Sequence, residues 1–216
     1  MRPSARRRSV TTTMSDFLSR GFSGRRRVDP ELAERLPPGQ YVEPGFPVLT
    51  AGPTPRIDPN GWGLRIDGMV AQPREWTAAQ FRELTFETVP CDIHCVTKWS
   101  KLGTSFRGVP LDVLLADVEP RGAYAMAYSH GGYTTNLALD DLTGGKAWVV
   151  IEHEDEPLPR EHGGPVRLLV PHLYFWKSAK WLAGLRVMDH DEPGFWEVNG
   201  YHNRGDPWQE QRYWND

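Results

Sequence analysis

The chain has 216 residues, a formal net charge of −3 and 39% apolar residues, a composition typical of a globular domain with a hydrophobic core. Two cysteines are too few for a disulfide framework, and no stretch approaches the roughly 20 apolar residues that a membrane span needs. These values exclude a coiled coil, a collagen-like chain and a fully disordered chain, while nine Trp, seven Tyr and eight Phe make the sequence rich in aromatics.

Basic residues are concentrated at the N-terminus. Residues 1–27 contain eight Arg and one acidic residue, Asp16, whereas the remaining residues include 17 basic and 27 acidic ones. A segment with this charge and so few apolar residues cannot bury a core, which favours a disordered arm over a folded element. We therefore predict a basic, disordered arm at residues 1–39 and a single domain at residues 40–216.

The arginines of the arm raise the question of an export signal. Three consecutive arginines at 6–8 resemble a twin-arginine signal, but residues 9–15 are rich in Ser and Thr where such a signal is apolar. We predict a cytoplasmic protein on this basis. Met14 offers an alternative translation start, so the natural chain begins at Met1 or at Met14.

Proline separates the arm from the regular structure. A short helix is expected at 30–35, and the proline-rich stretch at 37–59 excludes a helix or a central strand. Further along, Trp62, Leu64 and Ile66 alternate with polar or small residues, which predicts a half-buried strand. The proline-rich stretch is therefore expected to wrap a surface or a ligand, or to act as a linker.

Helices in the domain are predicted to be short. Thr77 and Gln80 have the spacing of a capping box, which begins a helix that carries Phe81 and Leu84. Pro110 is expected at the first position of a second helix, because proline is favoured there. The apolar residues of that helix fall on one face and are Leu111, Leu114, Leu115 and Val118.

Short strands are expected between turn-forming clusters of glycine and proline. Strands and helices do not alternate regularly, so we predict an α+β fold with mixed β-sheets and few short helices. Segment 193–214 contains three Trp and is expected to pack on the domain. The predicted strands lie at 86–93, 123–129, 133–139, 147–151, 166–170 and 185–188.

The densest group of reactive side chains is the stretch from Cys91 to Ser100. Cys91, His94 and Cys95 offer zinc ligands, but no second Cys/His pair follows at zinc-ribbon spacing. A redox-active disulfide is a second interpretation, although its usual spacer is two residues and the spacer here is three. A catalytic or metal-bound thiolate near Lys98, or two buried thiols without chemistry, are the remaining alternatives.

A second cluster combines cations, aromatics and glycines between residues 162 and 181. Arg167, Lys177 and Lys180, together with Ser178, are the side chains needed to hold a phosphate or a polar heterocycle. The chain contains neither G-x-x-x-x-G-K-[ST] nor G-x-G-x-x-G, so the common nucleotide-binding loops are absent. On residue types alone, a solvated basic surface is the simpler interpretation.

Three segments carry a resemblance to a known family. IHCVTKWS followed by FRGVPLDVLL, within 93–115, and HGGPVRLLVPHLYFWKSAKWL, at 162–182, resemble the molybdopterin-binding oxidoreductase domain of the sulfite oxidase family. FWEVNGYHNRGDPWQEQRYW, at 195–214, is similar to the tail of small bacterial members. The resemblance covers residues 40–214 and implies the sulfite oxidase-type fold.

The resemblance also implies a cofactor, molybdenum–molybdopterin, and its contacts. Cys95 corresponds to the cysteine that binds molybdenum in the family, a role that suits a soft, electron-donating thiolate, whereas Cys91 has no counterpart. Arg167 and Lys180 would meet the cofactor phosphate, and His162 replaces an amide side chain. The implied cofactor contacts are Leu49, Thr50, Cys95, Ser129, His162, Arg167, Ser178, Ala179 and Lys180.

Two positions differ from authentic sulfite oxidases. The substrate-binding Arg of those enzymes has no clear equivalent, because Arg56 comes too late in the chain, and Phe195 and Trp196 stand where those enzymes have a tyrosine. The resemblance therefore implies oxygen-atom transfer in either direction, as sulfite oxidation or as S- or N-oxide reduction. Further candidates for the pocket wall are Trp99, His130, Trp176 and Lys177.

The implied protein is a molybdopterin-dependent oxidoreductase that acts on a small molecule and exchanges electrons with a separate haem, flavin or iron–sulfur protein. A first alternative is a non-catalytic ligand- or protein-binding module on the same fold. A second is a zinc-stabilised nucleic-acid binder that uses the basic arm, which the acidic remainder of the chain disfavours. We predict no nucleic-acid partner and no membrane span.

Overall fold

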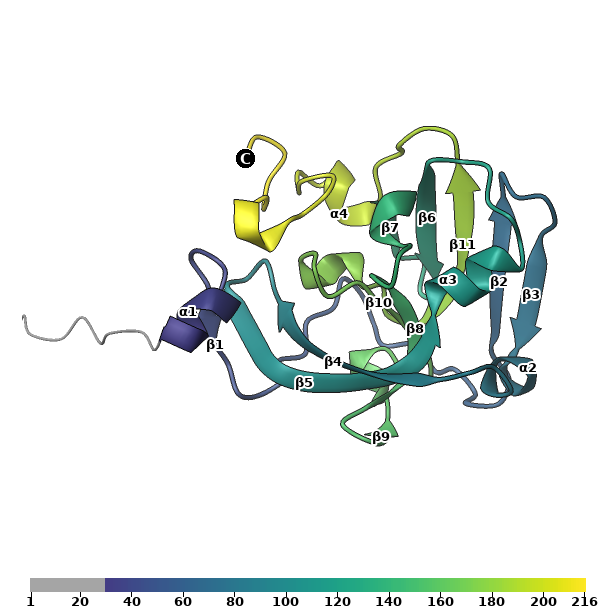
Figure 1. The fold of residues 1–216 in the computed structure, drawn as a ribbon, viewed down its shortest axis with the longest axis horizontal. Helices are drawn as coiled ribbons and strands as arrows, with labels where there is room; N and C mark the ends of the chain where they lie inside the picture. The colour runs from purple at the N-terminus through teal and green to yellow at the C-terminus, as the bar shows by residue number, and fades with distance from the viewer. Residues whose placement is uncertain (1–29) are drawn as a thin grey trace, which may run out of the picture.

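Two mixed β-sheets, whose strands come from distant parts of the sequence, form the frame of the computed structural model, which describes residues 30–216 (Figure 1). The first sheet has six strands in the order β1-β5-β8-β10, with β4 also paired to β5 and β9 to β8. Its strands are β1 (Tyr41–Val42), β4 (Glu87–His94), β5 (Trp99–Pro110), β8 (Trp148–His153), β9 (Glu156–Pro157) and β10 (Arg167–Leu169).

The second sheet has five strands in the order β3-β2-β11-β6-β7. Strand β2 runs parallel to β11, as β1 does to β5 in the first sheet, and the other pairs among these strands are antiparallel. This mixture confirms the predicted fold class. The strands are β2 (Gly63–Gly68), β3 (Arg74–Thr77), β6 (Tyr124–Ser129), β7 (Thr134–Ala138) and β11 (Leu182–Met188).

The helices are short, as predicted, and none within residues 30–216 is long and apolar enough to cross a membrane. Thr77 Oγ1 accepts a hydrogen bond from Gln80 N at 3.2 Å, and Thr77 N donates to Gln80 Oε1 at 2.9 Å, which confirms the capping box. Pro110 is the N-cap of α3, one position before the expected one, because it also ends β5. The helices are α1 (Pro30–Arg35), α2 (Ala78–Arg82), α3 (Leu111–Ala116), α4 (Phe195–Val198) and the 3-10 helices η2 (Leu139–Asp141), η3 (Arg160–His162), η4 (Phe175–Lys177) and η5 (Pro207–Gln209).

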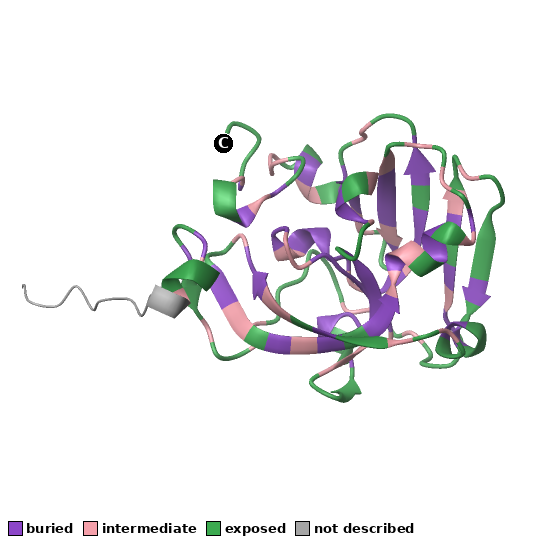
Figure 2. Cartoon of the chain, viewed as in Figure 1, coloured by how far each residue is buried: buried purple, intermediate pink, exposed green. Residues whose placement is uncertain are grey.

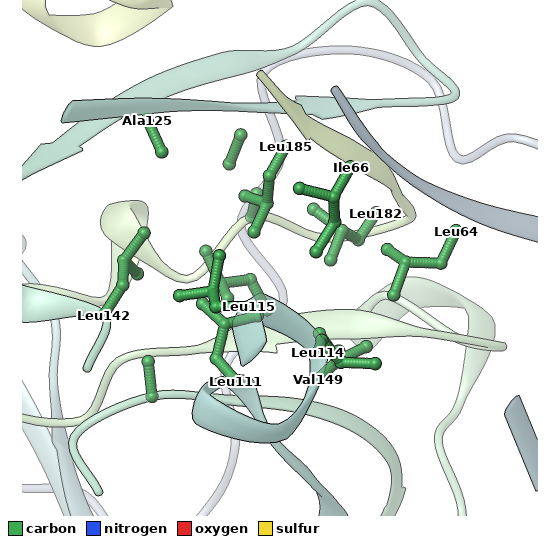
Figure 3. Packing of buried hydrophobic residues seen from close by; sticks show 14 of the residues in the cluster. Leu64, Ile66, Leu111, Leu114, Leu115, Ala125, Leu142, Val149, Leu182 and Leu185 are labelled. Atoms are coloured by element: carbon green, nitrogen blue, oxygen red, sulfur yellow. The ribbon is translucent and has the colours of Figure 1, made fainter. Parts of the chain in front are cut away.

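The main hydrophobic core draws on both sheets and on α2 and α3 (Figure 3). Leu111, Leu114 and Leu115 lie on the predicted face of α3 and belong to the same buried cluster as Ile66 of β2 and Leu185 of β11. Figure 2 shows that buried residues follow the inner strands, whereas β3, at the edge of the second sheet, is mostly exposed. The core therefore holds the two sheets together and fixes the strand ends that carry the site.

The longest strand, β5, has no counterpart in the sequence-based prediction. It spans 12 residues, and its glycines and charged side chains interrupt the alternation of apolar and polar residues that reveals a strand. A Cβ atom at Gly108 would lie 2.2 Å from the carbonyl oxygen of Val149 in β8. Glycine is needed at this position because the two strands approach closely beside a shift in their register.

Residues 30–39, which the sequence places in the arm, are described and contact the domain. Helix α1 lies where a short helix is expected, and Arg35 Nε donates a hydrogen bond to Asp92 Oδ2 of β4 at 2.8 Å. The proline-rich stretch that follows forms no regular element apart from β1, as predicted. The predicted disorder of residues 1–29, the export-like arginines and the alternative translation start lie outside the described residues.

Candidate active site

Cys95 lies in a tight turn that joins β4 to β5. Lys98 N donates to the carbonyl oxygen of Cys95 at 2.9 Å, and Cys95 N donates to that of Trp99 at 2.8 Å. Lys98 adopts a left-handed conformation, with φ of 77°, which lets the chain reverse direction within four residues. The turn therefore fixes the backbone of Cys95 at the end of a sheet that is anchored in the core.

The Cys95 thiol is buried and faces a cavity. The residue is 8% exposed, and Thr97 Oγ1 lies 3.1 Å from Cys95 Sγ and donates to it. Burial raises the pKa of the thiol, and the hydroxyl of Thr97 acts in the opposite direction. A thiol that is costly to ionise alone becomes a good ligand once a metal cation compensates the charge.

The two cysteines are free and differ in environment. Cys91, which is partly buried within β4, is not among the residues that line the cavity, and burial raises its pKa to about 12. The structure therefore offers no support for the redox-active disulfide interpretation. Among residues 30–216, no cluster of three or more His, Cys, Asp or Glu side chains could hold a metal ion, so the zinc interpretation gains no support either.

The cavity has a volume of about 370 Å³ and is bounded by five segments of the chain. These are the proline-rich stretch at 46–53, the Cys95 turn, the glycine turn at 131–133, the cationic stretch at 167–181 and the C-terminal tail at 195–201. Aromatic side chains dominate the wall, and no carboxylate occurs among the described residues that line it. The aromatic lining residues are Phe46, Trp99, Tyr133, Phe175, Trp176, Trp181, Phe195, Trp196 and Tyr201.

The structure brings six of the nine implied cofactor contacts to the wall of this one cavity. The other three are not among its lining residues. Ala179 packs in the main core, and Ser129 ends β6 with a buried hydroxyl that has no hydrogen-bond partner within the described part of the chain. His162 stacks on Phe46, with ring centroids 3.8 Å apart, and Phe46 forms the wall. The six that line the cavity are Leu49, Thr50, Cys95, Arg167, Ser178 and Lys180.

Arg167 brings a fully buried positive charge to the cavity wall. Its Nη1 donates to the carbonyl oxygen of His162 and its Nη2 to that of Ser178, both at 2.7 Å. No carboxylate pairs with this guanidinium among the residues that the structure describes, and burial lowers its pKa to about 9. A buried cation without a counter-ion is costly, so the site favours a ligand that supplies negative charge.

Lys180 adds a second cation and holds the proline-rich stretch against the site. Its Nζ donates to the carbonyl oxygens of Leu49 at 2.8 Å and Glu161 at 2.6 Å. Burial, reinforced by the charge of Arg167, lowers the pKa of Lys180 to about 8. The two cations make the wall electropositive, and the Lys180–Leu49 contact gives the proline-rich stretch its place over the cavity.

The other wall candidates divide in two. Trp99 and Trp176 line the cavity, as expected, whereas His130 and Lys177 are not among the lining residues. Lys177 is instead fully buried in an ion pair with Glu197 of α4, with 2.6 Å between Lys177 Nζ and Glu197 Oε1. The same carboxylate oxygen accepts a hydrogen bond from Trp176 Nε1 at 2.9 Å. Lys177 therefore anchors the tail instead of facing the cavity.

Several lining residues have no role in the sequence-based prediction. Thr97 belongs to the Cys91–Ser100 cluster and Phe46 to the proline-rich stretch, and both segments are part of the sequence-based prediction. Neither residue could be singled out there, because a threonine hydroxyl and a phenylalanine ring are common on every kind of surface. Tyr201 lies on the tail, and its ring contacts Trp176 edge-on with centroids 5.2 Å apart. The richness of the tail in aromatics was the available signal, but it does not say which rings reach the cavity.

The cavity brings together a buried thiol, the fully buried Arg167 and the partly buried Lys180 within aromatic walls, an arrangement that suits a large anionic cofactor held through a soft metal ligand. A family model for the oxidoreductase molybdopterin-binding domain matches residues 51–196. The chain belongs to this family. It is therefore a molybdopterin-dependent oxidoreductase with the sulfite oxidase-type fold.

Similar proteins cover the chain to different extents. An uncharacterised oxidoreductase of Bacillus subtilis, YuiH, is 43% identical over 182 residues, which are 83% of this chain and 92% of that protein. The protein-methionine-sulfoxide reductase catalytic subunit MsrP of Gluconobacter oxydans is 28% identical over 64% of this chain, which spans half of that relative. The crystal structure of the sulfane dehydrogenase SoxCD from Paracoccus pantotrophus shares the fold, with a TM-score of 0.58 and 22% identity over 63% of this chain and 40% of that one.

The residues present fit a molybdenum–molybdopterin cofactor. Cys95 offers the single soft protein ligand that such a metal takes from the chain, since the remaining ligands come from the cofactor itself. Arg167 and Lys180 supply uncompensated positive charge at the same wall, where a phosphate would need it. The donor set therefore agrees with the family, while the individual contacts of these residues stay predictions.

Proposed function

We propose that the protein catalyses oxygen-atom transfer on a small sulfur- or nitrogen-oxide type substrate. The observation that carries the proposal is the Cys95 thiol, buried in the wall of an electropositive, aromatic cavity. When bound, the molybdenum cofactor supplies a metal centre that exchanges two electrons and one oxygen atom with a substrate. The chain contributes the ligand, the charges that hold the cofactor and the walls that exclude water.

Each of these contributions belongs to particular residues. Cys95 would bind the metal as a thiolate, with Thr97 Oγ1 donating to its sulfur and so limiting its electron donation. Arg167 and Lys180 would hold the phosphate of the cofactor, and the stretch at 46–53 would cover it. The cofactor would thus be gripped at its metal end and at its phosphate end by different sheets and loops.

The walls favour a neutral sulfur oxide as the substrate. Trp176, Trp196 and Tyr201 line the cavity and would exclude water from the reacting atoms. Arg56, the cation that comes nearest in the sequence to the anion-binding Arg of sulfite oxidases, is exposed and is not a lining residue. Relatives named as protein-methionine-sulfoxide reductase catalytic subunits support reduction of an S-oxide over oxidation of sulfite.

We also propose that a separate protein, carrying haem, flavin or iron–sulfur, exchanges electrons with this one. Two-electron chemistry at a single metal requires a one- or two-electron partner to restore the starting state. Relatives in the same family are named as subunits, which is consistent with a division of labour between substrate chemistry and electron supply.

A dye-linked activity screen tests the proposal. Protein from a molybdopterin-competent host is assayed with S-oxides, N-oxides and sulfite, using a reduced or oxidised viologen-type dye as the artificial partner. We expect turnover of at least one class and its loss in Cys95→Ala, with Cys91→Ala as the matched control that keeps activity. A loaded protein that turns over none of these substrates would favour the alternative of a non-catalytic binding module, whereas turnover that survives in Cys95→Ala would contradict the proposed role of Cys95.

A further inference from the structure

The backbone of the Cys95 turn is held from both ends of the chain. The carbonyl oxygens of Cys95 and Val96 each accept a hydrogen bond from a side chain that is distant in sequence, Gln40 for Cys95 and Arg212 for Val96. Both donors lie outside residues 51–196, the part of the chain that the family model matches. The turn that carries the proposed metal ligand is therefore supported by residues that family membership does not assign.

Arg212 reaches the turn from the C-terminal tail. Its Nη1 donates to the carbonyl oxygen of Val96 at 2.9 Å, and its Nη2 donates to that of Pro38 at 3.3 Å. The side chain is 91% buried, since only 9% of it is exposed, and its guanidinium lies 5.0 Å from the ring centroid of Tyr174. A planar guanidinium can satisfy two carbonyls at once, so it ties the tail, the turn and the N-terminal segment to one point.

Gln40 reaches the same turn from the N-terminal side. Its Nε2 donates to the carbonyl oxygen of Cys95 at 3.0 Å, and the residue is buried. This carbonyl also accepts the Lys98 N–H that closes the turn. Gln40 thus binds the Cys95 carbonyl oxygen, which is also the acceptor of the hydrogen bond that closes the turn. Arg212 binds the carbonyl oxygen of the next residue, Val96.

We propose that Arg212 and Gln40 are positioning residues that hold the Cys95 turn in the conformation that presents the thiol to the cofactor. The inference rests on the proposed role of Cys95 as the metal ligand. Groups that orient a metal ligand without touching the metal typically change metal affinity about 10–100-fold when they are removed. The C-terminal tail is accordingly part of the metal site, although it supplies no ligand.

Hydrogen–deuterium exchange of the full chain without cofactor tests the clamp directly. Arg212→Met keeps an unbranched side chain and removes both donors, whereas Arg212→Lys keeps the charge and can reach only one carbonyl. We expect the amides of Cys95 and Lys98 to exchange about tenfold faster in Arg212→Met, and by an intermediate amount in Arg212→Lys. Arg204→Met is the matched control, because Arg204 lies on the same tail and pairs with Asp141.

The electron paramagnetic resonance spectrum of the Mo(V) state in the loaded protein supplies a readout that a purely structural role would not move. We expect Arg212→Met and Gln40→Met to shift this spectrum and to lose molybdenum about tenfold faster on dialysis, with Arg204→Met unchanged. Gln40→Met changes no charge. If Arg212→Met does not fold, the Mo(V) spectrum and the rate of molybdenum loss of Gln40→Met test the proposal instead.

Two results would overturn the clamp. Exchange at Cys95 and Lys98 that stays within twofold of the unaltered protein would show that the turn does not depend on these donors. A spectrum that stays unchanged while exchange rises would show that they support the fold without positioning the ligand. Failure of the proposed metal ligand looks different, because Cys95→Ser would then keep the Mo(V) spectrum of the unaltered protein.

Discussion

At the scale of single residues, the wall of the cavity carries positive charges that no carboxylate of the described residues compensates. Arg167 is fully buried, donates only to backbone carbonyls and lines the cavity, while its pKa falls to about 9. Lys180 lies at the same wall with a pKa of about 8. Proteins rarely retain such desolvated cations unless a ligand compensates them, and the proposed anionic cofactor would do so here.

Two buried histidines make the stability of the protein without its cofactor depend on pH. Burial lowers the pKa of His94 and of His162 to about 4, so both are neutral in the folded state. The unfolded chain takes up their protons near pH 6.5, which means that stability is lost as the pH falls from 6.5 toward 4. We expect a loss on the order of 2–3 kcal/mol per histidine across this window.

Urea unfolding between pH 4 and pH 7 measures this effect. His162→Gln should lose less stability on acidification than the unaltered protein, because one of the two groups is gone. His190→Gln serves as the control, since His190 is exposed and lies beside the exposed carboxylates of Asp189 and Glu192. An equal acid loss in His162→Gln and in the unaltered protein would contradict the assignment of the pH dependence to His162.

At the scale of elements, α4 is docked by one buried ion pair. Glu197 pairs with Lys177, and its Oε1 also accepts from Thr135 Oγ1 of β7 at 3.0 Å. Breaking a buried pair leaves an uncompensated charge, which costs about 3–5 kcal/mol, whereas replacing both partners with apolar residues is often neutral. The pair therefore sets the position of the tail more than it adds to stability.

Chemical denaturation of three variants tests the docking of α4. Glu197→Leu should lower the free energy of unfolding by about 3 kcal/mol, and the double variant Lys177→Met/Glu197→Leu should recover most of the loss. Glu192→Gln, which breaks an exposed pair with Arg186, should cost less than 1 kcal/mol. A Glu197→Leu protein as stable as Glu192→Gln would show that α4 is held by other contacts.

The sequence predicts elements whose signal is local and misses those whose reason is long-range. Helix α2 could be predicted because Thr77 and Gln80 cap it within one turn, and β2 because Leu64 and Ile66 alternate with polar residues. Strand β5 could not, because its pairing with β4 and β8 overrides a pattern broken by glycine. A local sequence pattern reports on the burial and capping of a single element. It does not report which distant strands pair with that element.

The residues of the candidate site also separate into those with a local signal in the sequence and those without one. Cys95, Arg167 and Lys180 could be predicted because the motifs around them resemble a known family, and the structure places all three at one cavity. Arg212 and Glu197 could not, because their functions come from contacts with residues 116 positions or 20 positions away. An arginine in a tail gives no local sign that it contacts the turn that carries the proposed metal ligand.

At the scale of the whole molecule, residues 30–216 bring five distant segments together around the cavity. The lining residues within this part of the chain run from Phe46 to Tyr201, so residues 30–39, the described end of the predicted arm, contribute none of them. We expect a chain that lacks residues 1–27 to keep its molybdenum content and its thermal stability. The nucleic-acid alternative expects the opposite, a loss of function with the arm, and a salt-dependent binding assay on the shortened protein would show that loss.

The whole molecule also explains the aromatic content of the chain. Nine of its aromatic side chains line the cavity, and they come from both ends of the domain as well as from its middle. Aromatic rings packed around the pterin of the cofactor would exclude water from the site. Both ends of the domain would contribute to this wall. The proline-rich stretch and the tail form little regular structure, and both supply residues to the wall of this cavity.

The most direct test of the central claim is the molybdenum and pterin content of purified protein from a molybdopterin-competent host. We expect about one molybdenum per chain by mass spectrometry, which the family and the donor set at Cys95 require. Cys95→Ser should lose at least nine-tenths of the metal while Cys91→Ser, four residues away in the sequence, keeps it. Protein without molybdenum, or equal retention of the metal by the two variants, would contradict the account.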